Sequence, residues 1–388
     1  MRRRSFLALA ASLALISHRG AALAAQTPVP AGDTPLMSLL RRLPGDALGD
    51  VGIRVANYDA QLAARGVAGG GSGLDPEAWR AAISERTMLP LAMSDPLNPA
   101  WREGLGFDLR DVAAMAEVGP SDASILLLTG RFDAALPAAW AAAGYAPTET
   151  AGMTWYTLGE DNVLDFEDPL GLLHLGTLSH LALLDGTVAG TAKQADMERV
   201  LAVAGGDGAS FGDGPGASLA AAPADLADGW IVAGTVLVAT GDPLAAMPSN
   251  PNVPADVQER LATQAAYAAE GAPRMPPIAL ALVGTIAGGA GAAADLPQPH
   301  AVAVVMPADP ADAAMVAETV TRRLTTESLL GGDGLLGRPW TDAFTAMSVE
   351  TAPSGAVVID LTPAEGVPAD LLVTLVQQRN LSILYWAG

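Results

Sequence analysis

The chain of 388 residues contains no cysteine, a single lysine at Lys193 and four histidines, and only 16% of its residues are charged. Without cysteine there can be no disulfide, no thioether-attached haem and no cysteine-ligated iron–sulfur cluster. The stability of the folded chain must therefore come from burial of apolar residues, which make up 50% of the sequence.

Basic residues are scarce, since 21 Lys and Arg stand against 42 Asp and Glu, and the net charge is −21. A field of this sign opposes nucleic acids and anionic lipid surfaces, because binding there requires Lys or Arg to displace counterions. We therefore expect no nucleic-acid partner. The replacement of Lys by Arg is typical of GC-biased codon usage, and adaptation to a salty exterior is the alternative.

Residues 1–25 have the layout of a secretory signal, with a basic start, an apolar run over residues 6–16 and the cleavage site Ala22-Leu23-Ala24. Arg3-Arg4-Ser5-Phe6-Leu7 resembles the twin-arginine export motif, and an arginine-rich ordinary export signal is the alternative. The apolar run is too short to span a bilayer stably. We predict export to the periplasm or the exterior, with no transmembrane segment in the mature chain.

Composition divides the rest of the chain into four parts. Residues 26–48 form a Pro-rich leader with a short helix over 35–42, and residues 205–216 form a Gly-rich linker. The linker separates a first module, 49–204, from a second module, 217–388. Both modules are expected to have the α+β class, with helices on one face of an antiparallel sheet.

Apolar spacing and turn residues predict the elements of the first module. Asp75 before Pro76 is a typical helix start, and Asp108 stands in the same position before apolar residues at helical spacing. Residues 180–191 are expected to form either one strand or a pair of strands that turns at Asp185-Gly186. The expected helices are 75–84, 106–118, 133–143 and 194–203, and the other expected strands are 124–129 and 153–158.

The second module is also predicted to combine strands and helices. Strands are expected at 230–240, 278–286, 300–306, 346–350, 356–361 and 381–386, and helices at 255–270, 309–324 and 369–378. From His300 onward the predicted order is β-α-β-β-α-β, which is ferredoxin-like, so the two modules are expected to be related.

Residues 276–294 carry no charge, and a membrane helix is an alternative for them. Two prolines open this segment and its second half is mostly Gly and Ala, which favours a buried strand followed by a Gly-rich loop.

Three histidines remain after the signal: His174, His180 and His300. The spacing of the first two matches neither helical nor short-loop zinc sites, and no cysteine is available. We interpret all three as structural or surface residues, with a zinc site as the alternative.

Gly208-Ala209-Ser210-Phe211-Gly212 matches the G-x-S-x-G nucleophile motif. That motif requires a strand before it and a helix after it, whereas Gly-rich sequence flanks this one on both sides. A hydrolase built on Ser210 is therefore disfavoured.

Residues 160–168 form the densest acidic cluster, with Asp161, Asp165 and Asp168 among its carboxylates. Closely spaced oxygen ligands suit calcium, but the pattern lacks the EF-hand glycine and terminal glutamate. We interpret the cluster as a solvated loop, with calcium binding as the alternative.

The Gly-rich segments 69–73, 205–216 and 331–337 contain no phosphate-binding loop signature, and Lys193 lies far from all of them. We interpret them as ordinary loops.

Three short motifs occur in order: Asn57-Tyr58-Asp59, the stretch GFDLRDV at 106–112, and Gly130-Arg131-Phe132-Asp133. Over about residues 50–160 the chain resembles a loose group of exported bacterial proteins that has no assigned activity. The resemblance implies export and carries over no functional residue. Each Phe-Asp pair is interpreted as a buried anchor followed by a helix N-cap.

No nucleophile, base or metal set is assembled in the sequence, so we expect no catalytic residue, no metal site and no cofactor. The predicted function is a non-enzymatic binding or scaffold module for an envelope partner or a small ligand. The alternative is an enzyme, or a cofactor- or metal-binding protein, whose site combines distant carboxylates. A deep pocket holding two of the acidic-cluster aspartates or of the histidines would favour that alternative.

Overall fold

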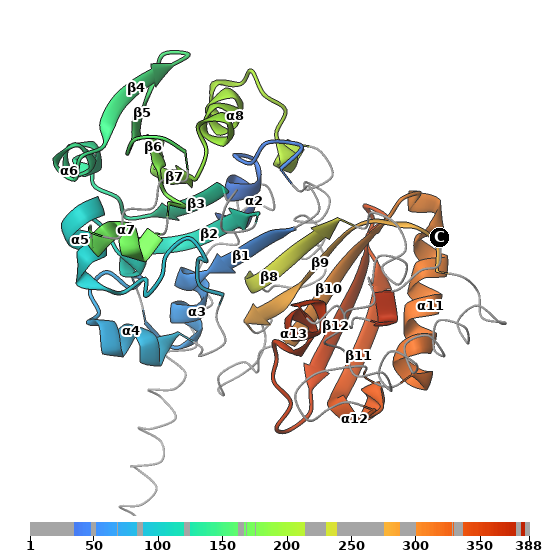
Figure 1. Ribbon diagram of the computed structural model, residues 1–388. Coiled ribbons are helices and arrows are strands. Elements are labelled where there is room, and N and C mark those ends of the chain that lie inside the picture. The colour runs from blue at the N-terminus through green and yellow to red at the C-terminus, as the bar shows by residue number, and fades with distance from the viewer. Residues whose placement is uncertain are drawn as a thin grey trace, which may run out of the picture.

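A single antiparallel sheet of twelve strands runs through the molecule (Figure 1). The computed structural model describes residues 35–47, 52–67, 69–83, 88–119, 125–161, 167, 169–174, 176–213, 230–238, 275–287, 300–327, 329, 337–377 and 382–384. In sheet order the strands are β11-β12-β10-β9-β8-β1-β2-β3-β7-β6-β5-β4. Helices pack on this sheet, which confirms the α+β class.

Seven strands belong to the first half of the described chain, which we define as residues 53–213. They are β1 (Ile53–Asn57), β2 (Val112–Val118), β3 (Ile125–Gly130), β4 (Ala146–Thr150), β5 (Met153–Thr157), β6 (His180–Leu184) and β7 (Thr187–Thr191). The second half, residues 230–384, contributes five: β8 (Trp230–Val238), β9 (Ile278–Ala287), β10 (His300–Pro307), β11 (Phe344–Thr351) and β12 (Val357–Pro363).

The two halves use the same strand order. The first half runs β1-β2-β3-β7-β6 and the second runs β8-β9-β10-β12-β11, with every neighbouring pair antiparallel. The hairpin β4–β5 extends the first half beyond β6. The first strands of the two halves, β1 and β8, pair antiparallel with Val55 opposite Gly234, and this pairing makes the sheet continuous.

Burial explains which segments became strands. Strands β3 and β10 are buried on both faces over most of their length, and they accordingly read as continuous apolar runs. The outermost strands, β4 and β11, are largely exposed. Asp185 and Gly186 both have positive φ, as a two-residue hairpin turn requires, and they join β6 to β7, which confirms the predicted alternative of a pair of strands.

One face of the sheet carries most of the helices. Apolar side chains of α3 to α6 pack there on the first half, those of α11 to α13 pack on the second, and Val373 of α13 joins the first of these clusters. The helices are α3 (Tyr58–Ala64), α4 (Pro76–Ala82), α5 (Pro99–Leu105), α6 (Leu136–Ala142), α7 (Pro169–His174), α11 (Ala313–Thr326), α12 (Trp340–Ala343) and α13 (Leu371–Gln377).

The opposite face of the first half is covered by α2 (Pro35–Leu40) and α8 (Gln194–Gly205), so the expectation of helices on one face does not hold there. Leu39 and Leu201 pack on the alternate side chains of the strands, such as Ala116 and Leu127. The 3₁₀ turn η2 (Phe211–Asp213) also contacts α2, and the N–H of Phe211 donates to the carbonyl of Leu43. Residues 205–213 of the predicted linker are therefore packed against the first half.

The predicted helix over 106–118 is wrong. Asp108 does cap a helical turn, but that turn is the short 3₁₀ helix η1 (Leu109–Asp111), and β2 follows at once. The run Val112–Val118 is rich in Ala and buried on both faces, so its apolar pattern does not alternate and resembles a helix. Pairing with β1 and β3 determines the extended conformation.

Near the end of the chain, the predicted closing strand over 381–386 is wrong for Ser382–Leu384, which form the 3₁₀ turn η4. From β10 onward the order β-α-β-β-α is as predicted. The predicted signal, residues 26–34 of the predicted leader and the helix at 255–270 lie outside the described residues. No helix in the part of the chain that the structure describes is long and apolar enough to cross a membrane.

Candidate functional site

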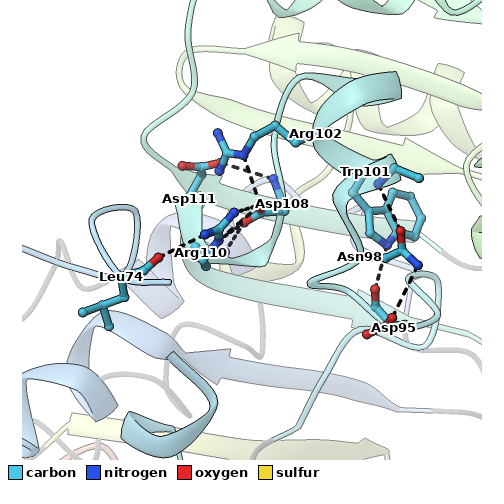
Figure 2. A network of polar contacts seen from close by, with 9 residues as sticks. Leu74, Asp95, Asn98, Trp101, Arg102, Asp108, Arg110 and Asp111 are labelled. Carbon is cyan, nitrogen blue, oxygen red and sulfur yellow. Dashed lines mark hydrogen bonds and ion pairs between the residues drawn. The ribbon is translucent and has the colours of Figure 1, made fainter. Parts of the chain in front are cut away.

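The three motifs noted in the sequence meet at one place on the first half. The backbone N–H of Arg131 donates to the carbonyl of Asp111, and the rings of Phe107 and Phe132 lie edge to face with centroids 5.2 Å apart. Ion pairs join Arg102, Asp108, Arg110 and Asp111 (Figure 2), and a further ion pair joins Arg131 to Asp59. We call this group the arginine–aspartate cluster; it consists of Asp59, Arg102, Asp108, Arg110, Asp111 and Arg131.

Local sequence positions the centre of the cluster. Asn98 caps the start of α5, and Gly106, with φ of 81°, ends that helix in the left-handed conformation. The chain then turns so that Asp108 caps η1 in a capping box with Asp111. Both carboxylates are thereby fixed beside Arg102, which extends from α5.

Asp108 is 0% exposed, and both of its oxygens are occupied. Oδ1 accepts from the backbone N–H and the Nε of Arg110, at 2.9 and 3.0 Å. Oδ2 accepts from Nη2 of Arg110 at 2.5 Å and from Nε of Arg102 at 3.1 Å. Arg102 also reaches Asp111, whose Oδ2 lies 2.6 Å from Nη2 (Figure 2).

These bonds determine the charge of Asp108. Burial on its own would raise the pKa of this carboxyl, but the hydrogen bonds from Arg110 and Arg102 together outweigh burial and hold the pKa below its ordinary value. The hydrogen bond with Asp108 in turn raises the pKa of Arg110. A carboxylate that stays ionised and has no unoccupied oxygen is unsuited to take a proton from a substrate. The chemistry of this group is therefore that of an anchor.

The Gly-rich loop after α3 lies directly on the cluster. Arg131 pairs with Asp59 across 2.8 Å, and a Cβ added at Gly70 would lie 2.1 Å from Nη1 of Arg131. A Cβ at Gly71 would lie 2.5 Å from the ring of Trp79. The loop can approach these two side chains only because it has no side chains of its own at these positions.

A second buried carboxylate, Glu117 of β2, holds the loop that precedes α5. Glu117 is 1% exposed and accepts from the backbone N–H groups of Leu91 and Ala92, at 2.9 and 2.8 Å. It also pairs with Arg54 of β1 at 2.8 Å, and Arg54 donates in addition to the carbonyl of Leu89. This carboxylate again fixes a loop to the sheet.

Of the predicted site candidates, the structure brings His180 and Asp161 together. Nε2 of His180 lies 2.8 Å from Oδ1 of Asp161, which also accepts from the backbone N–H of Gln194. His180 is 2% exposed and packs edge to face on Trp155, with ring centroids 5.4 Å apart. Burial tends to raise the pKa of Asp161, but the bonds from Gln194 and His180 outweigh it and lower that pKa.

The other two histidines lie elsewhere. Nδ1 of His300, at the start of β10, lies 3.0 Å from Oδ1 of Asp360 on β12. Nδ1 of the buried His174 accepts from the backbone N–H of Gly176. No group of three or more His, Asp or Glu in the described ranges could hold a metal ion. Asp165 and Asp168, and with them most of the predicted acidic loop, lie outside those ranges.

Ser210 does not lie on the strand-to-helix turn that the nucleophile motif requires. It forms an isolated bridge with Pro44, and its hydroxyl accepts from the backbone N–H of Gly212. A pocket of about 400 Å³ lies nearby between α2 and α8, and its polar lining includes Arg41, Arg42 and Asp185. None of the predicted site candidates that the structure describes lines this pocket.

Sequence reasoning missed the partners of these carboxylates. Glu117 within the apolar run of β2 was the available signal, because a lone charge in a buried segment requires a partner. The partner Arg54 comes from β1, a short strand that the apolar pattern did not predict.

Comparison with known proteins finds no matching family model, no similar curated protein and no similar solved structure.

Proposed function

We propose that the chain is an exported, non-enzymatic protein of the cell envelope that binds or scaffolds a partner through the loops around the arginine–aspartate cluster. The observation that carries the proposal is the use of buried carboxylates. In both Asp108 and Glu117, each carboxylate oxygen accepts hydrogen bonds from arginine side chains or backbone N–H groups. Loops held in one conformation by a rigid sheet are suited to recognition, because little ordering is left to occur on binding.

Export is the second part of the proposal. It is supported by the signal-like residues 1–25 and by the acidic composition, with a net charge of −21 that opposes nucleic acids and anionic surfaces. The expected location is the periplasm or the exterior, and the expected route is twin-arginine export.

The test is native mass spectrometry of the intact protein purified from the envelope of its own cells. The expected species has the mass of the chain from Ala25 or Gln26 onward, alone or with a partner that dissociates without leaving a cofactor. A metal or an organic cofactor retained on the chain would overturn the non-enzymatic proposal. A chain that still carries residues 1–25 in the cytoplasm would overturn export.

A pair of variants tests the role of the loops in partner binding. Gly70→Val places a Cβ where the Arg131 guanidinium lies and a β-branched side chain at a φ of 78°, so the loop, the Arg131 side chain or both must shift and their contact is lost. Gly69→Val is the matched control, because Gly69 has a similar φ of 81° and a Cβ there meets nothing within 4 Å. A bound species present with the wild type and with Gly69→Val, but lost with Gly70→Val, is the expected result. Equal binding by all three forms would contradict a role for these loops.

One observation favours a second candidate function. Nδ1 of His180 is buried and has no hydrogen-bond partner among the described residues, while Nε2 is held by Asp161. A histidine oriented by a carboxylate is one component of acid–base or metal sites. Zinc or a small molecule that co-purifies with the wild type, but not with His180→Gln, would support an enzyme or cofactor-binding protein instead.

A further inference from the structure

The two ends of the sheet are protected differently against pairing with another strand. At one end, β4 has five residues and includes Pro147, which lacks an N–H. At the other end, β11 has eight residues and contains neither proline nor lysine, the residues that usually block an edge. The two strands lie at opposite ends of the molecule (Figure 1).

The outer side of β11 offers a regular row of backbone groups. Its register with β12 is continuous from Ala346 to Thr351, and the only irregularity lies before Ala346. The N–H of Ala352 donates to the carbonyl of Ala356, so Ala352 faces β12. Because neighbouring residues of a strand face opposite sides, the backbone groups of Met347, Val349 and Thr351 point away from β12.

The side chains on this strand suit a copy of itself. Met347 and Val349 lie half-buried on the face covered by α11, while Ala346, Ser348 and Glu350 lie exposed on the other face. If two β11 strands run antiparallel with Ser348 opposite its own copy, Met347 of each strand lies opposite Val349 of the other. Glu350 then lies opposite Ala346, so the single charge of each strand avoids its copy.

We propose that β11 pairs antiparallel with β11 of a second copy of this chain, with Ser348 at the two-fold axis, and so extends the sheet across a symmetric dimer. The chain already joins its two halves in this manner, through the antiparallel pair β1–β8. A dimer made by the last strands of the sheet repeats that junction between two molecules. The proposal is independent of the proposed function, since it requires neither export nor a ligand.

The net charge of −21 opposes the association of two copies. The dimer is therefore expected to strengthen with salt, because at about 0.15 M and above the Debye length falls below about 8 Å. This direction separates it from an association held by ion pairs, which salt weakens.

Four forms of the full mature chain test the register by sedimentation equilibrium in about 0.3 M salt, up to about 100 µM. Ala346→Lys places an ammonium opposite Glu350 of the second copy and is expected to strengthen the dimer about threefold to tenfold. Ala346→Glu places a carboxylate there and is expected to weaken it by a similar factor. Adding Glu350→Lys to Ala346→Glu forms the same ion pair with its charges exchanged, and is expected to restore the dimer and strengthen it as Ala346→Lys does.

Within one molecule, position 346 pairs with Thr362 and position 350 with Val358, so these variants are expected to leave the fold intact. Circular dichroism and the melting temperature check this point. A wild type that stays monomeric throughout the concentration range overturns the proposal. A dimer that is insensitive to position 346, or one that the double variant fails to restore, overturns it as well.

Discussion

The two halves of the sheet share a strand order but differ in their buried side chains: the first half buries several charged groups, and the second half, as far as the structure describes it, buries almost only apolar ones. In the first half, three buried carboxylates, Asp108, Asp111 and Glu117, are paired with arginine or with backbone N–H groups. In the described part of the second half, Arg323 is the buried charged side chain, and β9 and β10 present mainly Val, Ile, Leu and Ala to both faces.

This difference shows what the charges contribute. Strands of the second half form without buried ions, as β9 and β10 demonstrate with their apolar side chains, whereas β2 of the first half carries the buried Glu117. The carboxylates of the first half instead hold the connections between its elements, the loops before η1 and before α5. Apolar burial therefore builds the sheet, and buried ion pairs determine the conformation of the loops beside it.

The largest expected effect comes from removing an anchor of the first half. Glu117→Ala leaves two backbone N–H groups and the Arg54 guanidinium without their acceptor, and it is expected to lower the free energy of unfolding by about 4 kcal/mol. Urea titration followed by circular dichroism measures the change. The matched change in the second half is Thr285→Val, at a buried position of β9, expected to cost below about 1 kcal/mol. Equal losses for the two variants would remove the distinction between the halves.

Asp108→Asn keeps the shape of the side chain but removes its charge. The expected loss at neutral pH is about 3 kcal/mol, since two arginines lose a buried ionised partner. The pKa of Asp108 is lowered in the folded chain, so its contribution is complete above about pH 4, the ordinary range of Asp, and is lost as pH falls through the folded pKa. The difference in the free energy of unfolding between wild type and Asp108→Asn should therefore shrink as the pH falls from neutral to acidic, and unfolding curves recorded at several pH values measure it. A constant difference across that range would be inconsistent with the assigned charge.

Gly130 packs against the backbone of Asp111, so adding a side chain at position 130 tests the contact between the motifs at 106–112 and 130–133. A Cβ at this position would lie 2.2 Å from the carbonyl oxygen of Asp111, which belongs to the backbone and cannot move aside easily. Gly130→Ala is expected to lower the free energy of unfolding by about 2 kcal/mol. Gly73→Ala, where a Cβ meets nothing within 4 Å, is the control and is expected to be neutral or slightly stabilising. Thermal melts of the two variants compare them, and equal melting temperatures would mean that the contact is loose.

The smallest expected effect distinguishes the two His–Asp pairs. His180 is 2% exposed, whereas the side chain of His300 is 33% exposed. Asp161→Asn is expected to cost about 1 kcal/mol, because a buried ring loses its partner, and Asp360→Asn less than about 0.5 kcal/mol, because water replaces the carboxylate. Chemical denaturation of both variants at neutral pH gives the comparison. A larger loss of unfolding free energy for Asp360→Asn than for Asp161→Asn would contradict the conclusion that the buried His180–Asp161 pair contributes more to stability.

The parts of the fold that sequence predicts are those set by neighbouring residues. The hairpin of β6 and β7 follows from Asp185-Gly186, and α4 follows from Asp75 and Pro76. The strand β2 could not be predicted, because its run of Ala and Met suits a helix equally well and distant strands decide between the two. The repeat of strand order was inferred only as related modules, since no repeated residues accompany it.

The candidate site was predictable to a similar extent. Asp108 was identified as a cap from its own sequence position, and it does cap η1. Its ion pair with Arg102 depends on the turn at Gly106, and the pair of Asp59 with Arg131 depends on the placement of β3 beside β2. Such contacts between elements have no local signature, so they emerge only from the assembled fold.

The pairing of β1 with β8 also has a consequence for how the protein is made. Ile53 and Val236 lie opposite each other, although nearly the whole first half separates them along the chain. During synthesis β1 and its partner β2 are made before β8, and until β8 emerges from the ribosome β1 is an open edge of the sheet. The arrival of β8 closes that edge, so completion of the second half also protects the first.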